Sequence, residues 1–425
     1  MTPSNPKILF LAHRVPYPPN RGERIRSFHM LRFLAQRADV SLAFLGEERP
    51  SPETQQALEC LCRDVAGLRL GRYRRWINAA RSLAFGRTAT EGLFQCNRLR
   101  RLLARWSKTT RFDAVVVFCS SMVQYLDVPG LAGVPVLLDL IDVDSQKWLD
   151  YAAEASGVQR WLFQIEGKRL RRLEQSLPPK VKAITLVSRC EAELYRSFCP
   201  TDLVHAISNG VDLDYFRPRE DLNSAASQNC VFVGALNYRA NVDGLHWFCN
   251  EIWPEVRRHQ PKATFTVVGS HPSPLVRRLA KRPGVHLACD VPDVRPYLAE
   301  AAMVVVPLRI ARGIQNKVLE ALAMAKAVIA TPEALEGIAV EPEVHACQAL
   351  APAQWIESMV RLLRDAPARD LLGRAGRTFV ETHYCWDRQL QPLATLLGLR
   401  AAWYDGSQGI TTKQDAKNSL ASCHG

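Results

Sequence analysis

Short, continuous apolar runs alternate with helical stretches along most of this 425-residue chain. In the first half, the apolar runs cover residues 7–12, 40–45, 114–118, 134–138 and 183–187. Runs without alternating polar positions are typical of strands in a parallel sheet that is buried on both faces. Helical segments lie between these runs. The pattern therefore predicts a βαβα domain of the doubly wound α/β class.

The second half of the chain repeats this alternation. Its apolar runs cover residues 231–233, 264–268, 285–287, 303–306 and 327–330. Its helical stretches cover residues 241–259, 274–281, 316–325 and 352–365. The second half therefore predicts another doubly wound α/β domain.

The junction between the two domains is predicted at the segment ISNGVDLDYFRP, residues 207–218, because its Asn-Gly and Asp-rich positions favour turns. The predicted domains are residues 1–208 and residues 209–385. We expect a helix at residues 386–404 that returns to the first domain, and a disordered polar tail at residues 405–425. Two such domains in tandem are expected to face a central cleft, since ligands of doubly wound folds bind outside the carboxyl ends of the strands.

The loop after the first predicted strand is rich in proline and leads into a helix. It contains His13, Arg21 and Gly22, and a helix N-terminus with arginines nearby suits a phosphate group. An ordinary strand-to-helix connection is the alternative. The loop lacks both G-x-G-x-x-G and G-x-x-x-x-G-K-[ST], which disfavours a nicotinamide-dinucleotide enzyme and a P-loop ATPase.

A carboxylate, Asp142, follows the apolar run that ends near residue 141. At the carboxyl end of a strand it would point into the cleft, where a carboxylate can act as a general base. The alternative is a helix N-cap for the segment that starts near Ser145, a role that suits Asp144 better. In the second domain, Gly234, Asn237 and Arg239 follow the first strand, where backbone N–H groups and a cation would meet an anionic donor group.

The sequence RGIQNKVLEALAMAKAVIAT, residues 312–331, predicts a loop, a helix and a buried strand. The loop from Gly313 to Asn316 ends at a helix N-terminus, whose free N–H groups are donors for a diphosphate. Lys317 adds a point charge, and Glu320 can accept two hydrogen bonds from vicinal hydroxyls such as those of a ribose. A surface Lys–Glu pair is the alternative, but the apolar neighbours predict a buried helix, where an unused pair is costly.

Positive charge is concentrated in the first half of the chain. The net charge is +13, and residues 1–208 hold 31 Lys and Arg against 20 Asp and Glu, while the remainder holds 24 against 22. Such an excess suggests an anionic partner, or it only keeps the protein soluble. Residues 70–85 mix arginine with Trp, Ile, Leu and Phe, as an amphipathic helix lying on an anionic inner leaflet would. A solvated basic helix is the alternative.

Several other classes of protein are disfavoured. The arginines are spread over separate helices without a finger or a stacking platform, so we expect no nucleic-acid partner. The 12 cysteines show no metal-ligand spacing, so zinc is not expected. With no signal-peptide pattern and no stretch of about 18 apolar residues, a cytoplasmic protein is expected.

The order and spacing of these motifs resemble glycosyltransferase family 4, whose members are retaining enzymes with the GT-B fold of two Rossmann-like domains. The resemblance runs from about residue 6 to about residue 398. It rests on ISNGVD at 207–212, VGAL at 233–236, NKVLEALA at 316–323 and AVIAT at 327–331. RGIQNKVLE at 312–320, with LDLIDVDSQKW at 138–148, is similar to the sugar transferases found beside bacterial exosortase and exopolysaccharide clusters.

The resemblance implies that Glu320 binds the donor ribose, because it matches the second Glu of the family's Glu-x₇-Glu motif. The other donor-site residues that it implies are Gly234, Asn237, Arg239, Arg312, Gly313, Ile314, Gln315, Asn316 and Lys317. Two positions depart from the family pattern. Arg312 stands eight residues before Glu320, where the family often has a Glu that positions the donor sugar. Asp142 follows an isoleucine where the family often has histidine.

The implied reaction is transfer of a sugar from a nucleotide diphosphate sugar to an acceptor hydroxyl with retention. No metal and no cofactor is expected, since helix N–H groups and Arg or Lys would stabilise the leaving diphosphate. Asp142 would then orient the acceptor or relay a proton. We expect a lipid-diphosphate-linked or glycan acceptor on the basic first domain, at the inner face of a bacterial membrane, in exopolysaccharide or glycolipid synthesis. A nucleotide-sugar epimerase or hydrolase of the same fold is an alternative, as is a non-catalytic binding protein.

Overall fold

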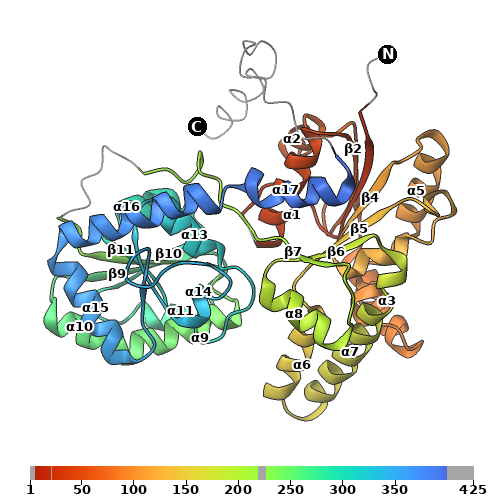
Figure 1. The fold of residues 1–425 in the computed structure, drawn as a ribbon. Coiled ribbons are helices and arrows are strands. Elements are labelled where there is room, and N and C mark those ends of the chain that lie inside the picture. Colours follow the sequence, from red (N-terminus) through yellow and green to blue (C-terminus); the bar gives the residue numbers. More distant parts are fainter. Residues whose placement is uncertain (1–4, 21, 219–225, 400–425) are drawn as a thin grey trace, which may run out of the picture. The chain divides into compact units, whose positions relative to one another are not determined.

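The computed structural model describes residues 5–20, 22–218 and 226–399, and the described chain forms two compact units (Figure 1). Unit 1 holds the described residues up to Ile207 and those from Leu390 onward, and unit 2 runs from Ser208 to Gln389. The predicted boundaries are after residues 208 and 385. The tail predicted at residues 405–425 lies outside the described residues.

Unit 1 contains a parallel sheet of seven strands in the order β3-β2-β1-β4-β5-β6-β7. Its strands are β1 (Lys7–Ala12), β2 (Asp39–Gly46), β3 (Asp64–Arg69), β4 (Ala114–Phe118), β5 (Val136–Ile141), β6 (Ala183–Leu186) and β7 (Val204–Ala206). Its helices are α1 (Gly22–Ala35), α2 (Pro52–Glu59), α3 (Arg72–Ala84), α4 (Ala89–Leu93), α5 (Asn97–Thr109), α6 (Asp144–Glu154), α7 (Gly157–Gln175) and α8 (Arg189–Phe198).

Unit 2 contains a parallel sheet of six strands in the order β10-β9-β8-β11-β12-β13. Its strands are β8 (Asn229–Val233), β9 (Thr264–Gly269), β10 (Val285–Cys289), β11 (Met303–Val306), β12 (Ala327–Ala330) and β13 (Cys347–Gln348). Its helices are α9 (Arg239–Trp247), α10 (Trp253–His259), α11 (Pro274–Leu279), α12 (Arg295–Glu300), α13 (Asn316–Ala323), α14 (Pro332–Leu335), α15 (Pro352–Arg364) and α16 (Ala366–His383). The doubly wound α/β fold predicted for both halves is confirmed.

The central strands were predicted because their residues are buried on both faces. Every residue of β4, β11 and β12 is buried, and these strands match the apolar runs end to end. Strands β3, β7 and β13 carry no such run. Each lies at an outer edge of its sheet, where one side of the strand has no neighbour and a short or half-exposed segment suffices.

Two predicted helices differ from the observed ones. The stretch 241–259 is interrupted by a π-helical segment, Phe248–Ile252, between α9 and α10. The helix predicted at residues 386–404 is α17 (Trp386–Leu397), which ends early because Gly398 takes a left-handed conformation with φ of 68°. Within the described residues, no helix has both the length and the apolar character needed to cross a bilayer.

A buried ion pair, Arg26–Asp139, ties four segments of unit 1 together. Arg26 of α1 donates from Nη2 to Asp139 Oδ2 of β5 at 2.6 Å and from Nη1 to the carbonyl of Ile207 at 2.8 Å. Thr185 Oγ1 of β6 donates to the same carboxylate oxygen at 2.7 Å. The side chains of Arg26 and Asp139 are 1% and 0% exposed. The Asp139 carboxylate of β5 is therefore bonded to α1 through Arg26 and to β6 through Thr185, and Arg26 also holds Ile207.

The first residues of unit 2 pack against the segment that precedes α17. Val211 N–H donates to the carbonyl of Tyr384 at 2.8 Å. A Cβ atom on Gly210 would lie 2.7 Å from the backbone nitrogen of Trp386, so this position admits only glycine without rearrangement. The predicted turn segment is thus an ordered part of unit 2, and not a free linker.

Candidate active site

The strand order of unit 2 reverses between β8 and β11, which are neighbours in the sheet. In doubly wound folds, the crevice at the carboxyl ends of such strands is where ligands bind. The loop after β8 contains Gly234, and the loop after β11 leads through Gly313 to α13. The two loops predicted to bind the donor are therefore brought to one point of unit 2.

The loop after β8 approaches its neighbours too closely for a side chain at Gly234. A Cβ atom there would lie 2.9 Å from Asn241 Nδ2 and 3.0 Å from Lys317 Nζ. A Cβ atom on Gly269, at the end of β9, would lie 1.8 Å from the carbonyl oxygen of Gly234. The backbone of Gly234 is thus held next to the Lys317 amine, and this close approach requires glycine.

The Lys317 amine is held by Asn241, a residue that the sequence did not single out. Lys317 Nζ donates to Asn241 Oδ1 at 2.6 Å, and Asn241 Nδ2 donates to the carbonyl of Ala235 at 2.8 Å. The amine also lies 4.6 Å from the centre of the Phe232 ring. Burial lowers the pKa of Lys317 to about 7, and Glu320 only partly opposes this change. An anion bound beside this amine would raise its pKa, so that the amine would carry its full positive charge.

Glu320 lies one turn along α13 from Lys317. Burial raises the pKa of its carboxyl to about 7, partly offset by the nearby amine. Glu320 also acts on Tyr215, whose pKa is raised by burial, by Asp293 and by this carboxyl. The Arg295 guanidinium lies 3.8 Å from the centre of the Tyr215 ring and pairs with Asp293 at 2.7 Å. Glu320 thus adjoins an aromatic–arginine stack that the sequence analysis missed.

The N-terminus of α13 has no side-chain cap. Gln315 occupies the N-cap position, but its Nε2 donates back to the carbonyl of Arg312 at 3.1 Å. Gly313 takes a left-handed conformation with φ of 63°, which lets the chain turn into the helix, and Ile314 is buried. Asn316 Oδ1 accepts from Asn209 Nδ2 at 2.9 Å. The first N–H groups of α13 therefore have no side-chain acceptor in the described structure and suit an anion.

The remaining predicted donor residues are placed less closely. Asn237 and Arg239 are exposed, and Arg239 is the first residue of α9. Arg312 precedes Gly313 in the loop after β11 and is half-buried. All three lie on the two loops that leave the switch point between β8 and β11.

In unit 1 the strand order reverses between β1 and β4, and His13 follows β1. Its ring stacks on Phe118 at 5.9 Å and meets Phe94 edge-on at 5.3 Å. Burial lowers the pKa of His13 to about 4, so the ring is neutral at physiological pH. Gly22 is exposed and begins α1, while Arg21 lies outside the described residues. The His13 side chain therefore packs against Phe118 and Phe94 as a neutral aromatic ring.

Asp142 follows a strained turn at the carboxyl end of β5. Ile141 has φ of 69° and Cys119, at the end of the neighbouring β4, has φ of 82°, values that side chains other than glycine rarely adopt. Asp142 Oδ1 is buried and has no hydrogen-bond partner among the described residues. Burial, followed by the charge of Glu191, raises the pKa of Asp142 to about 7.

Two buried carboxylates accept hydrogen bonds from the turn after Asp142, and the sequence predicted neither of them as part of the site. Glu191 of α8 accepts from Val143 N–H at 2.7 Å. Glu174 of α7 accepts from Ser145 N–H at 3.0 Å and also from the Ser145 hydroxyl. Burial raises the pKa of Glu174 to about 7. The segment that starts α6 is therefore fixed by carboxylates from two later helices.

The N-cap role expected for Asp144 is wrong. The N-cap of α6 is Val143, and Asp144 is the first helical residue. The Asp144 carboxylate instead accepts from Ser120 Oγ at 2.9 Å, which joins the end of β4 to the start of α6. A carboxylate in the first turn still suits the positive end of the helix.

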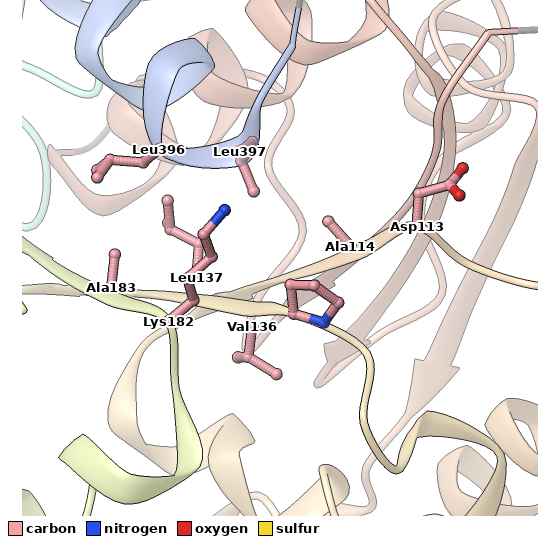
Figure 2. Close-up of a pocket in the computed structure, with 9 residues that line it drawn as sticks. Asp113, Ala114, Val136, Leu137, Lys182, Ala183, Leu396 and Leu397 are labelled. Carbon is pink, nitrogen blue, oxygen red and sulfur yellow. The ribbon is translucent and has the colours of Figure 1, made fainter.

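Figure 2 shows a pocket at the opposite edge of the unit 1 sheet. Ala114, Val136 and Ala183 in its wall are the first residues of β4, β5 and β6, and Leu396 and Leu397 of α17 close it. It lies at the amino ends of the strands, away from Asp142. We interpret it as a packing gap beneath α17, because ligands of this fold class bind at the other end.

No group of three His, Cys, Asp or Glu side chains within residues 5–20, 22–218 and 226–399 is arranged to hold a metal ion. The candidate donor site is built instead from an amine, backbone N–H groups and a carboxylate. These groups suit a diphosphate and a diol.

Two doubly wound units with these switch-point loops define the GT-B class of glycosyltransferase folds. The model of the family described as "Glycosyl transferases group 1" matches residues 227–365, which span most of unit 2 and all of α13. The chain is thereby a glycosyltransferase. No curated protein matches it at a significant level.

Solved structures of similar fold cover almost the whole chain. A sucrose-phosphate synthase from Thermosynechococcus elongatus has a TM-score of 0.66 at 16% identity, covering 92% of this chain and 98% of that one. HepE from Anabaena, in complex with UDP-glucose, has a TM-score of 0.66 at 12% identity, covering 92% and 99%. WaaG, a glycosyltransferase involved in lipopolysaccharide biosynthesis, has a TM-score of 0.62 at 16% identity, covering 92% and 100%.

Proposed function

We propose that this chain transfers a sugar from a nucleotide diphosphate sugar to an acceptor hydroxyl, with retention and without a metal ion. The observation that carries the proposal is the Lys317 amine, which Asn241 holds next to the Gly234 backbone and the uncapped N-terminus of α13. An amine of lowered pKa beside helix N–H groups that have no side-chain acceptor forms a site for a diphosphate. The UDP-glucose complex of HepE, a protein of similar fold, supports a nucleotide sugar as the donor.

In this proposal, different residues of unit 2 bind the diphosphate, the ribose and the leaving group of the donor. The diphosphate binds the N–H groups of α13 and the Lys317 amine. The ribose hydroxyls donate to Glu320, whose ionised form gains from those hydrogen bonds. Arg239 and Arg312 add positive charge near the leaving group. Charge that develops on the diphosphate oxygen as the sugar leaves is therefore stabilised without a cation from solution.

In the reaction, the anomeric carbon loses its bond to the diphosphate oxygen and gains one to the acceptor oxygen. The electron pair leaves with the diphosphate, and the acceptor hydroxyl loses a proton. We assign that proton to Asp142 Oδ1, directly or by relay. A carboxyl with a pKa near 7 and an oxygen without a partner is suited to accept a proton at neutral pH.

The acceptor is proposed to bind unit 1, which carries most of the positive charge, and to be lipid-diphosphate-linked or a glycan. This would place the enzyme in bacterial exopolysaccharide or glycolipid synthesis, in the cytoplasm at the periphery of an anionic inner membrane. An epimerase or a hydrolase of the same fold would process the donor alone. Product analysis with a radiolabelled nucleotide sugar, with and without acceptor lipid, separates these reactions.

Nucleotide binding is the first test of the proposal. A thermal-shift screen of nucleoside diphosphates and their sugars should raise the melting temperature of the wild-type protein, since a ligand that binds only the folded state stabilises it. Glu320→Ala should bind the preferred nucleotide about ten- to 100-fold more weakly, because two hydrogen bonds to a charged group are lost. If no nucleotide stabilises the wild type, the proposed donor site is wrong.

The pH profile of turnover tests the assignment of Asp142. At saturating donor and acceptor, kcat should rise with pH through about 7, because only the ionised carboxyl accepts a proton. Glu191→Gln removes a negative charge that raises the pKa of Asp142 and keeps an acceptor for Val143 N–H. It should therefore move the acid limb to lower pH.

Glu174→Gln is the matched control for this experiment. Glu174 is also buried with a pKa of about 7, but its partner is Ser145, whereas Glu191 is the main charge that raises the pKa of Asp142. This variant should leave the acid limb in place. A limb that moves with Glu174→Gln and not with Glu191→Gln would assign the titration to Glu174 instead.

A further inference from the structure

Helix α3 carries its large apolar residues on the side that faces solvent. Tyr73, Trp76 and Ile77 are 86%, 66% and 59% exposed, and they share one face of the helix with Ala80 and Ala84, which are also exposed. The residue of α3 that is buried against unit 1 is the small Ala79. A helix held by its small residues, with aromatic residues outward, presents a surface for a partner.

Helix α7 of the same unit also carries exposed apolar residues. Val158, Trp161 and Leu162, in its first two turns, are 75%, 59% and 42% exposed. Phe85, which directly follows α3, is 77% exposed. The described chain thus has seven of its exposed large apolar residues, from Tyr73 to Leu162, on α3, at the residue that follows it and on α7, all in one unit.

Helix α7 is fixed to the junction of α3 and α4 by buried or half-buried side chains. Arg169 Nη1 donates to the carbonyls of Leu83 and Arg87, each at 2.7 Å. The Glu166 carboxylate accepts from Ala89 N–H at 2.6 Å and Thr90 N–H at 2.8 Å. These hydrogen bonds join α7 to the end of α3 and the start of α4.

Helical spacing puts Val158 and Leu162 on the face of α7 that also carries Glu166 and Arg169. Val158, Leu162, Glu166 and Arg169 follow each other at intervals of four, four and three, so they line one face of the helix. Glu166 and Arg169 of this face contact the α3–α4 junction. Val158 and Leu162 therefore share the face of α7 whose later residues contact the α3–α4 junction, and Trp161 precedes Leu162 in the chain.

Arginine predominates on this surface, although Glu47 and Glu91 of neighbouring segments pair with Arg75 and Arg87. The segment from Gly71 to Arg87 contains five arginines and no acidic residue. Arg72, Arg74 and Arg81 are exposed on the flanks of the apolar stripe of α3, and Arg160 is exposed beside Trp161. Trp and Tyr with flanking arginines are the combination that binds at the boundary between lipid headgroups and acyl chains.

We propose that α3, Phe85 and the first two turns of α7 form one two-part docking face for the surface of an anionic lipid bilayer. Arginines bind the headgroups, and Trp76 and Trp161 insert below them. A protein partner or a second copy would need a complementary acidic surface, whereas an anionic bilayer offers negative charge and an apolar layer together. The inference rests on the proposed function only for the lipid-linked acceptor; the binding itself is independent of it.

Vesicle flotation tests the face with the full chain and vesicles of phosphatidylglycerol and phosphatidylcholine. Wild type should float with the anionic vesicles and not with phosphatidylcholine alone. Trp76→Ser and Trp161→Ser should each weaken the partition coefficient about tenfold, and the double variant about 100-fold, because both helices insert. Replacing Arg72, Arg74 and Arg81 with Gln should weaken it about fivefold per arginine and remove the preference for anionic lipid.

Two controls on unit 2 match these changes. Leu371 is 65% exposed and Arg278 is exposed, so Leu371→Ser and Arg278→Gln alter apolar area and charge away from the face and should leave flotation unchanged. Each variant should keep its thermal shift with nucleotide, which separates loss of docking from failure of the donor site. Unchanged flotation of the Trp76→Ser, Trp161→Ser double variant overturns the proposal. A wild-type dimer that this double variant abolishes, without binding to vesicles, would assign the face to a second copy.

Discussion

Lys317→Met is expected to slow sugar transfer about 100- to 1000-fold, the range that removal of one fixed charge-stabilising donor produces in other active sites. The amine donates to Asn241 at 2.6 Å and lies beside the backbone of Gly234. Charge grows on the diphosphate as the sugar leaves, so the loss should fall mainly on kcat. Radiolabelled donor with saturating acceptor measures it.

Proton uptake gives a second readout of the same residue. The pKa of Lys317 is about 7 in the free protein, so at pH 8 most of the amine is neutral. A bound diphosphate raises this pKa, and the complex must therefore take up a proton. Affinity should fall as the pH rises from about 7 to 9. Calorimetry in two buffers of different ionisation enthalpy should show uptake of close to one proton at pH 8, and none in Lys317→Met.

Lys326→Met is the matched control. Lys326 is also a half-buried lysine of unit 2, and burial lowers its pKa to about 8. Its amine donates to the carbonyl of Ala299 at 2.6 Å. Lys326 follows the C-terminal end of α13 and is therefore not at the N-terminus of that helix. This variant should lose stability but keep proton uptake and kcat. Normal turnover in Lys317→Met would show that the diphosphate binds elsewhere.

Arg26→Met is expected to lower the stability of unit 1 by about 3–5 kcal/mol, because it leaves the Asp139 carboxylate charged, buried and without its cation. The loss is larger than for an ordinary surface pair, since both side chains are almost fully inaccessible to solvent. The substitution also leaves the carbonyl of Ile207 without its hydrogen-bond donor. A chain with two units need not unfold in one step, so hydrogen exchange of the β5 and β6 amides is the appropriate measurement.

The comparison for this variant is the pair formed by Arg14 and Glu23. Their side chains are 45% and 31% exposed at a distance of 2.6 Å, and Arg14→Gln should cost less than about 1 kcal/mol. Adding Asp139→Leu to Arg26→Met should recover much of the loss, because the buried charge is then gone. A cost below about 1 kcal/mol for Arg26→Met alone would contradict the role assigned to the pair.

The predicted fold agrees with the structure where burial alone decides it. Strands β4, β11 and β12 are apolar at every position because helices cover both faces of a parallel sheet. The edge strands β3 and β13 were missed because an edge strand needs no continuous apolar run. The π-helical segment Phe248–Ile252 was missed because it keeps the apolar spacing of a helix.

The candidate site was predicted only in part. Loop glycines, a helix N-terminus and charged residues beside apolar ones are local signals, and they indicated Gly313, Lys317 and Glu320. Asn241 carries no such signal, because it lies 76 positions from Lys317 and resembles any polar residue in a first helical turn. Glu191 likewise lies 48 positions from Val143, which it holds. Such partners follow from strand order, which hydrophobic spacing does not encode.

The sequence by itself determined the fold class, the basic character of the first half and the amphipathic segment of α3, since each depends on composition and spacing along the chain. Only the tertiary structure decided that Asp139 is structural while Asp142 has an oxygen without a partner among the described residues, although Asp139 lies in β5 and Asp142 directly follows it. It also decided that the aromatic residues of α3 face outward and that α7 contacts the end of α3. Hydrophobic spacing specifies which residues share a face, but which face is covered, and by what, depends on segments distant in the chain.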